Sequence, residues 1–199
     1  MSTPDFSGMV RWPNVPACYG WLSLDQRGQW RMQGDPVVHH GLLAFLNRQY
    51  AHDDQGNYFV QNGPQRVFVT LDYTPWVLRL TSETTLLPQN QRLALETHTG
   101  ELAKSILGAA FDEEGNLLLE FEGGIALLCD RDLPALLACL RHADGNVAND
   151  DALLDVLELA PDSLSQLTLR WNDKNLPVRK LLRAGVARRY GYVSSPADI

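Results

Sequence analysis

The sequence lacks the features that mark secreted and membrane-spanning proteins. Its three cysteines, Cys18, Cys129 and Cys139, show neither C-x-x-C spacing nor the dense, even pattern of a disulfide scaffold. No apolar run approaches the length of about 20 residues that a membrane-spanning helix needs. The first residues also lack the charged segment and apolar run of a signal peptide. We therefore expect reduced thiols, a cytoplasmic location and no membrane partner.

Positive charge is scarce as well. The chain has 17 Lys and Arg against 24 Asp and Glu, a formal net charge of -7. Because an acidic surface repels phosphate backbones, we expect no nucleic-acid partner. The basic residues gather only between residues 179 and 189, where they alternate with apolar ones. This spacing is typical of one solvated face of a terminal element.

Motifs of catalysis and cofactor binding are missing too. The sequence has no Gly-x-Ser-x-Gly elbow, no glycine-rich phosphate loop and no His-Glu-x-x-His pair. The adjacent pair His39 and His40 would point about 100° apart at a helix start, so one metal ion suits both poorly. We expect one of them to cap the helix, and we expect no metal and no cofactor. A nucleophilic pair of Cys18 with either histidine is left open as an alternative.

What is present is the balance of an ordinary globular protein, with 45% hydrophobic and 21% charged residues. Helical spacing of apolar residues predicts helices over residues 39–50, after Asp132 and over residues 152–159. Alternating apolar residues between glycine, proline and acidic turns predict strands. These strands fall at residues 19–24, 29–33, 58–60, 66–71, 76–80, 92–96, 109–111, 116–121, 125–128, 167–171 and 176–181.

These elements predict an α+β protein, with antiparallel sheets and amphipathic helices on one side. Leu42 and Phe45 in the first helix and Leu136 and Leu140 in the second should face the sheets. We expect four parts: an extended arm at 1–17, a first α+β subdomain at 18–90, a second at 91–142 and a C-terminal helix-hairpin extension at 143–199.

A repeated motif supports two related subdomains. Residues 28–34 and the helix that contains Leu42 have a counterpart in residues 115–123 and the helix that contains Leu133. In each segment the sequence predicts, in this order, a turn, a strand, a glycine, an apolar connection and an amphipathic helix. Self-similarity of this kind indicates a strand-helix unit that the chain uses twice.

Several short motifs between residues 27 and 141 carry a family resemblance. They are Gly28-x-Trp30-x-x-x-Gly34-x-Pro36-Val37, Gly56-x-Tyr58-Phe59-Val60 and Arg66-Val67-x-Val69-x-x-Asp72-x-x-Pro75-Trp76. With them the chain resembles a family of proteobacterial proteins known as a domain of unknown function. The resemblance implies two α+β subdomains built from repeated strand-and-helix motifs, with a conjectured ligand-binding or signalling role. It supplies no catalytic residue.

One candidate pocket follows from these observations. Asp72 interrupts an apolar alternation, and we expect it to line a ligand site with Trp30, His39, Arg66 and Trp76. The alternative role for Asp72 is a corner residue that hydrogen-bonds its own turn.

Three functions are compatible with these features. The leading hypothesis is a non-enzymatic small-molecule-binding or signalling accessory protein. The second is a protein-protein interaction or homodimeric scaffold protein that uses exposed aromatic residues and the basic C-terminal element. The third is a Cys-dependent hydrolase that uses Cys18.

Overall fold

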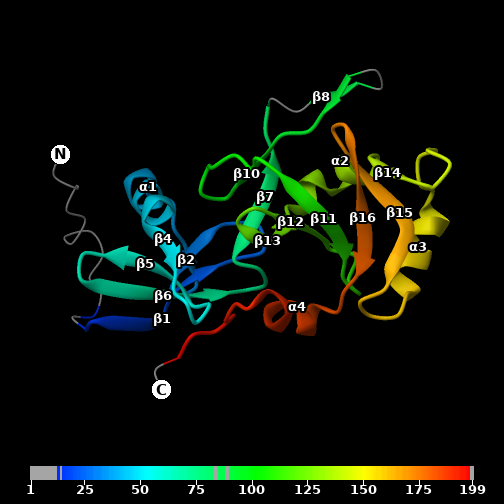
Figure 1. The fold of residues 1–199 in the computed structure, drawn as a ribbon. Helices are drawn as coiled ribbons and strands as arrows, with labels where there is room; N and C mark the ends of the chain where they lie inside the picture. The colour runs from blue at the N-terminus through cyan, green and yellow to red at the C-terminus, as the bar shows by residue number, and fades with distance from the viewer. Residues whose placement is uncertain (1–12, 14, 83–84, 88–89, 198–199) are drawn as a thin grey trace. The chain divides into compact units, whose positions relative to one another are not determined.

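The structure is a computed structural model that describes residues 13, 15–82, 85–87 and 90–197 (Figure 1). These residues form two compact units. Unit 1 comprises the described residues of 1–25, Gln29–Asp72 and 191–199, and unit 2 comprises Gln26–Gly28 and Tyr73–Tyr190. The subdomain boundaries that the sequence suggests after residues 17, 90 and 142 stay predictions.

Unit 1 contains one sheet and one helix. Helix α1 (His40–Gln49) buries Leu42, Phe45 and Leu46, as its apolar stripe predicts. The sheet has the order β3-β2-β1-β6-β5-β4. Its strands are β1 (Ala17–Leu24), β2 (Trp30–Met32), β3 (Asp35–Pro36), β4 (Tyr50–His52), β5 (Tyr58–Asn62) and β6 (Gln65–Leu71).

Unit 2 contains a larger sheet, in the order β10-β7-β13-β12-β11-β16-β15-β14. Its strands are β7 (Trp76–Leu80), β10 (Leu95–Thr97), β11 (Ile106–Phe111), β12 (Leu117–Phe121), β13 (Gly124–Leu128), β14 (Leu140–Arg141), β15 (Leu164–Trp171) and β16 (Lys174–Lys180). A separate two-stranded ribbon joins β8 (Thr85–Leu87) and β9 (Asn90–Arg92). The helical elements are the 3-10 turn η1 (Asp130–Asp132), α2 (Leu133–Leu137), α3 (Asp150–Glu158) and α4 (Arg183–Tyr190).

The α+β class is confirmed, but the expectation of antiparallel sheets was wrong, because both large sheets are mixed. Strand β1 runs parallel to β6, β7 runs parallel to β13, and β11 runs parallel to β16. Parallel neighbours need a long crossover connection, and here each connection contains several other elements. Alternating apolar residues mark a strand but do not indicate which distant strand it joins, so the pattern could not show these pairs.

The repeated motif appears in the topology of the two units. The series β1, β2, β3, α1, β4, β5, β6 matches the series β11, β12, β13, α2, β14, β15, β16. In both series the strands take the same order, and the first strand pairs in parallel with the last. Unit 2 adds β7 and β10 at one edge, α3 between β14 and β15, and α4 after β16. Helices α3 and α4 have no counterpart in the series of unit 1.

A recurring hairpin turn explains several acidic residues in the sequence. In unit 2 the backbone N–H of Asp112 donates to the Asn116 carbonyl at 3.1 Å, and the Asp112 carboxylate accepts from the Asn116 backbone N–H at 2.9 Å. Gly115 closes this turn at φ +83°, which glycine adopts without strain. Asp53 makes the same pair of bonds between β4 and β5 of unit 1. The carboxylate of Asp112 is therefore fully buried without being unsatisfied.

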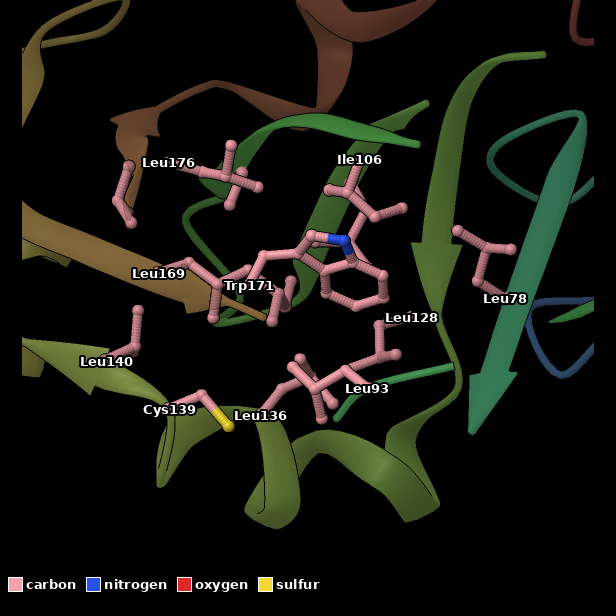
Figure 2. Close-up of a cluster of buried hydrophobic side chains, with 14 of the residues drawn as sticks. Leu78, Leu93, Ile106, Leu128, Leu136, Cys139, Leu140, Leu169, Trp171 and Leu176 are labelled. Carbon is pink, nitrogen blue, oxygen red and sulfur yellow. The ribbon is translucent and has the colours of Figure 1, made fainter. Parts of the chain in front are cut away.

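The main core of unit 2 lies against α2 (Figure 2). Trp171 reaches inward from β15, and Leu136 and Cys139 approach from the side of α2. Leu136 and Leu140 are fully buried, as predicted. Because α2 ends at Leu137 and β14 begins at Leu140, that predicted helix is shorter than its apolar pattern suggested.

Candidate functional site

Trp30, the first residue of the predicted pocket, lies in the core of unit 1. Its side chain is 1% exposed, and its Nε1–H donates to Asn47 Oδ1 of α1 at 2.7 Å. The indole also packs edge-to-face on Tyr50, with ring centroids 5.2 Å apart. Trp30 therefore holds α1 against the sheet.

The other predicted residues of unit 1 lie at its surface. His39 is the N-cap of α1, where its Nδ1 accepts from the Leu42 N–H at 3.2 Å, so the predicted capping role is confirmed. The guanidinium of Arg66 lies 4.6 Å from the centroid of the Phe59 ring. Asp72 is exposed at the end of β6.

Trp76 belongs to unit 2. It packs edge-to-face on Phe121 and also contacts the His98 ring, with centroids 6.1 Å and 5.6 Å away. The five predicted residues are thus divided between the two units, and their role as one ligand site stays a prediction.

Two other expectations concern cysteine and metal chemistry. Cys18 is 2% exposed, and burial raises the pKa of its thiol, which disfavours the reactive thiolate. All three thiols are free and buried. Across the part of the chain that the structure describes, no three His, Cys, Asp or Glu side chains gather as metal ligands would.

None of the described helices is both long and apolar enough to cross a bilayer.

Unit 2 contains a groove large enough for a small molecule. Its volume is about 700 Å³, within the range of about 300–1,000 Å³ that is typical of ligand sites. We call it the α4 groove, and it is lined by Pro161, Asp162, Leu181, Leu182, Ala184, Gly185, Arg188 and Arg189. A second hollow, lined in part by His142, Asp155 and Gln166 beside α3, has a volume of only about 260 Å³.

The α4 groove is built from elements that unit 2 adds to the repeated series. One wall is α4, and the other is the turn at Pro161 and Asp162 that leads out of α3 (Figure 1). Helix α4 begins where the backbone N–H of Arg183 donates to Glu113 Oε2 at 2.8 Å, a bond that lowers the pKa of Glu113. The helix buries Val186. Contacts with distant segments therefore hold α4 in place.

Charge in the groove is mostly positive. Arg189 Nη1 forms an ion pair with Asp162 Oδ1 at 2.6 Å, and both side chains are partly exposed. Arg188 is exposed, and its guanidinium has no hydrogen bond or ion pair to any residue that the structure describes. An exposed ion pair contributes only about 0–1 kcal/mol, so the bond between Arg189 and Asp162 is easily exchanged for another.

The last residue of α4 is tied to the sheet. Tyr190 donates a hydrogen bond from its hydroxyl to the carboxylate of Glu120 on β12. Burial and the neighbouring carboxylate raise the pKa of Tyr190 to about 12, so the hydroxyl keeps its proton at neutral pH. The groove wall is thereby fixed at both ends of the helix.

Sequence reasoning did not identify this groove. The basic cluster at residues 179–189 was interpreted as a solvated face, and its exposed arginines fit that interpretation in part. The signal that could have marked the site is the pair Ala184 and Gly185, because a methyl group and a hydrogen atom leave space beside Arg188 and Arg189. Asp162, the ion-pair partner of Arg189, lies in another segment, so no local pattern includes it.

The sequence model of one family matches residues 5–197 of the chain. This is the DUF2944 family, described as "Protein of unknown function (DUF2946)". The chain belongs to this family. The predicted membership of a domain-of-unknown-function family is therefore confirmed.

For this DUF2944 member, no curated protein gives a significant match. A crystal structure of a DUF1285 family protein from Silicibacter pomeroyi is similar, with a TM-score of 0.52 and 14% identity over 82% of this chain and 81% of that chain. At this identity the likeness concerns the fold alone. A DUF1285 family protein from Shewanella baltica gives a TM-score of 0.42 and 15% identity over 58% of this chain and 88% of that chain.

Proposed function

We propose that this DUF2944 member is a non-enzymatic small-molecule-binding accessory protein whose ligand occupies the α4 groove. The observation that carries the proposal is the groove itself, about 700 Å³ in volume, with an apolar lining and two arginines. An apolar lining supplies binding energy, and a few polar groups orient the ligand. The lining residues include no hydroxyl, thiol or imidazole group, which favours binding over catalysis at this site.

The location of the groove supports the proposal. Unit 1 and unit 2 share one series of strands and a helix, but the groove is formed where unit 2 has α4 and the turn after α3. Scaffolds commonly carry function on added segments rather than on the shared framework.

A titration of the full chain with butanoate, hexanoate and octanoate tests this function. Each buried methylene contributes about 0.8 kcal/mol, so the dissociation constant should fall by up to about fourfold per methylene until the groove is filled. Isothermal titration calorimetry measures this series directly. A dissociation constant that does not change with chain length would contradict an apolar binding groove.

A blocking variant locates the binding. Gly185 lines the groove, and a Cβ atom there meets no atom within 4 Å, so Gly185→Leu should fill the groove without disturbing the fold. Ala187→Leu, on the same helix but outside the lining, is the matched control. Octanoate binding should be lost in the first variant and kept in the second.

The pocket predicted from the sequence remains a competing location. Arg66→Ala and Asp72→Ala should leave octanoate binding unchanged if the α4 groove is the site. A loss of binding in either variant would favour the predicted set of Trp30, His39, Arg66, Asp72 and Trp76.

An interaction role is the second candidate function. Leu154 and Leu164 of unit 2 are each 58% exposed, so their apolar side chains are accessible to a partner. Light scattering of the purified chain tests the homodimeric form, and a strictly monomeric protein at high concentration would count against it.

Hydrolysis by Cys18 is the least favoured candidate, because the thiol is buried and its pKa is raised. Selective alkylation of Cys18 near neutral pH would revive it. Slow and equal reactivity of all three thiols would eliminate it.

A further inference from the structure

The charges around the α4 groove indicate what kind of headgroup it binds. Arg188 and Arg189 line the groove together with a single acidic residue, Asp162. A guanidinium is always charged, and its planar donors match the two oxygens of a carboxylate. The exposed and unpartnered Arg188 is therefore the natural contact for an anion, among the described residues of this groove.

Asp162 is held firmly beside these arginines. Its backbone N–H donates to the Lys180 carbonyl at 2.9 Å, and its own carbonyl accepts from Arg179 Nη1 at 3.2 Å. The residue has φ +65°, a conformation that these bonds help to hold. These bonds hold the backbone of Asp162 where its exposed carboxylate pairs with Arg189.

The rest of the lining is apolar. Leu182 is 43% exposed, whereas Leu181 is buried, and Pro161, Ala184 and Gly185 complete the surface. An alkyl or aryl group lying there would cover Leu182. A ligand that is complementary to the whole groove is therefore apolar at one end and negatively charged at the other.

We propose that the ligand of the α4 groove is a monoanionic amphiphile of the carboxylate class, and that Asp162 competes with its headgroup for Arg189. This inference rests on the proposed function and specifies its ligand. Asp162 neutralises one of the two arginines, so one positive charge is left for the ligand. A doubly charged headgroup such as a phosphate monoester would leave its second charge uncompensated beside Asp162 and would lose more hydration on binding, which makes Asp162 the residue that selects a single charge.

Calorimetric titrations with three probes that each contain eight carbon atoms test the inference. Octanoate should bind, octyl phosphate should bind more weakly and uncharged octanamide should bind at least tenfold more weakly. Arg188→Gln should weaken octanoate binding by about tenfold, the usual effect of losing one charge-assisted hydrogen bond. Arg170→Gln, an exposed arginine on β15 outside the lining, should have no effect.

The Asp162→Asn variant tests the competition. Octanoate should bind up to about fivefold more tightly, because an exposed ion pair of this kind holds Arg189 only weakly. The affinity for octyl phosphate should increase more than the affinity for octanoate, so the difference between the two dissociation constants should become smaller. Circular dichroism of each variant shows that it is folded.

The possible failures are separable. If octanamide binds as tightly as octanoate, or if Arg188→Gln behaves like Arg170→Gln, the headgroup inference is overturned while the groove keeps its function. If octyl phosphate binds more tightly than octanoate to the unaltered chain, the selection by Asp162 is overturned. If no probe binds, the proposed function fails and the inference fails with it.

Discussion

His98 should make the protein lose stability under mildly acidic conditions. This residue of unit 2 is 6% exposed, and its Nδ1 accepts from the Val77 N–H at 3.4 Å. Burial, with a smaller effect from the charge of Arg79, lowers the pKa of His98 to about 3. In an unfolded chain the same imidazole has a pKa of about 6.5.

The direction and size of the effect follow from this difference. Between the two pKa values the unfolded chain binds a proton that the folded chain does not, so stability falls as the pH falls below about 6.5. The loss is about 1.4 kcal/mol per pH unit well below the unfolded pKa. From pH 7 to pH 5 the free energy of unfolding should therefore decrease by about 2 kcal/mol.

Urea unfolding at pH 7 and pH 5 measures this loss. In His98→Asn the side-chain oxygen can still accept from Val77, but nothing titrates, so the variant should lose about 2 kcal/mol less than the unaltered chain. His40→Gln, at an exposed position, is the control and should behave like the unaltered chain. Equal losses in all three proteins would refute the reasoning.

Three carboxylates with lowered pKa values do not obscure the pH range in which His98 acts. The pKa values of Asp53, Glu113 and Glu122 are lowered, mainly by hydrogen bonds from backbone and side-chain donors that outweigh the opposing effect of burial. A lowered carboxylate pKa contributes stability that is present above the unfolded pKa of about 4 and is lost below it. These groups therefore act at a more acidic pH than His98.

Two further pairs of substitutions test the packing. Lys180 is 2% exposed, and its Nζ has no hydrogen-bond partner among the described residues, so Lys180→Met should raise the free energy of unfolding by about 1–3 kcal/mol. Lys174 is exposed on the same strand, so the control Lys174→Met should change the free energy of unfolding by less than about 0.5 kcal/mol. If Lys180→Met is instead less stable than the unaltered chain, the amine of Lys180 has a partner and the reasoning is wrong. At Gly56 (φ +78°) an added Cβ would lie 2.1 Å from the Gly191 carbonyl oxygen, whereas at Gly63 (φ +56°) it would meet nothing within 4 Å. In urea unfolding, Gly56→Ala should cost about 3 kcal/mol or more and Gly63→Ala about 1–2 kcal/mol, and equal costs would contradict the close approach.

The repeated motif and the buried helix faces could be predicted because their signals are local. Leu42 and Phe45 recur at the spacing of one helix face, and residues 28–34 and 115–123 share turn chemistry that needs no tertiary partner. The parallel strand pairs could not be predicted in this way. Leu22 of β1 pairs with Val69 of β6, and nothing in either strand specifies the other.

The candidate site was missed for a related physical reason. Helix α4 buries only Val186, so it has no apolar stripe, and its start depends on Glu113, which is 70 residues away. The conspicuous residue Trp30 was predicted to bind ligand, and in the structure its indole N–H donates to Asn47 in the core of unit 1. An aromatic residue with a polar tip suits both roles, and sequence alone does not separate them.

An NMR titration of the isotopically labelled full chain with octanoate tests the central claim most directly. If the α4 groove is the ligand site, the largest amide shifts will fall at Asp162, Gly185 and Arg188. Saturating shifts centred on Arg66 and Asp72, or no shifts at millimolar octanoate, would contradict the account.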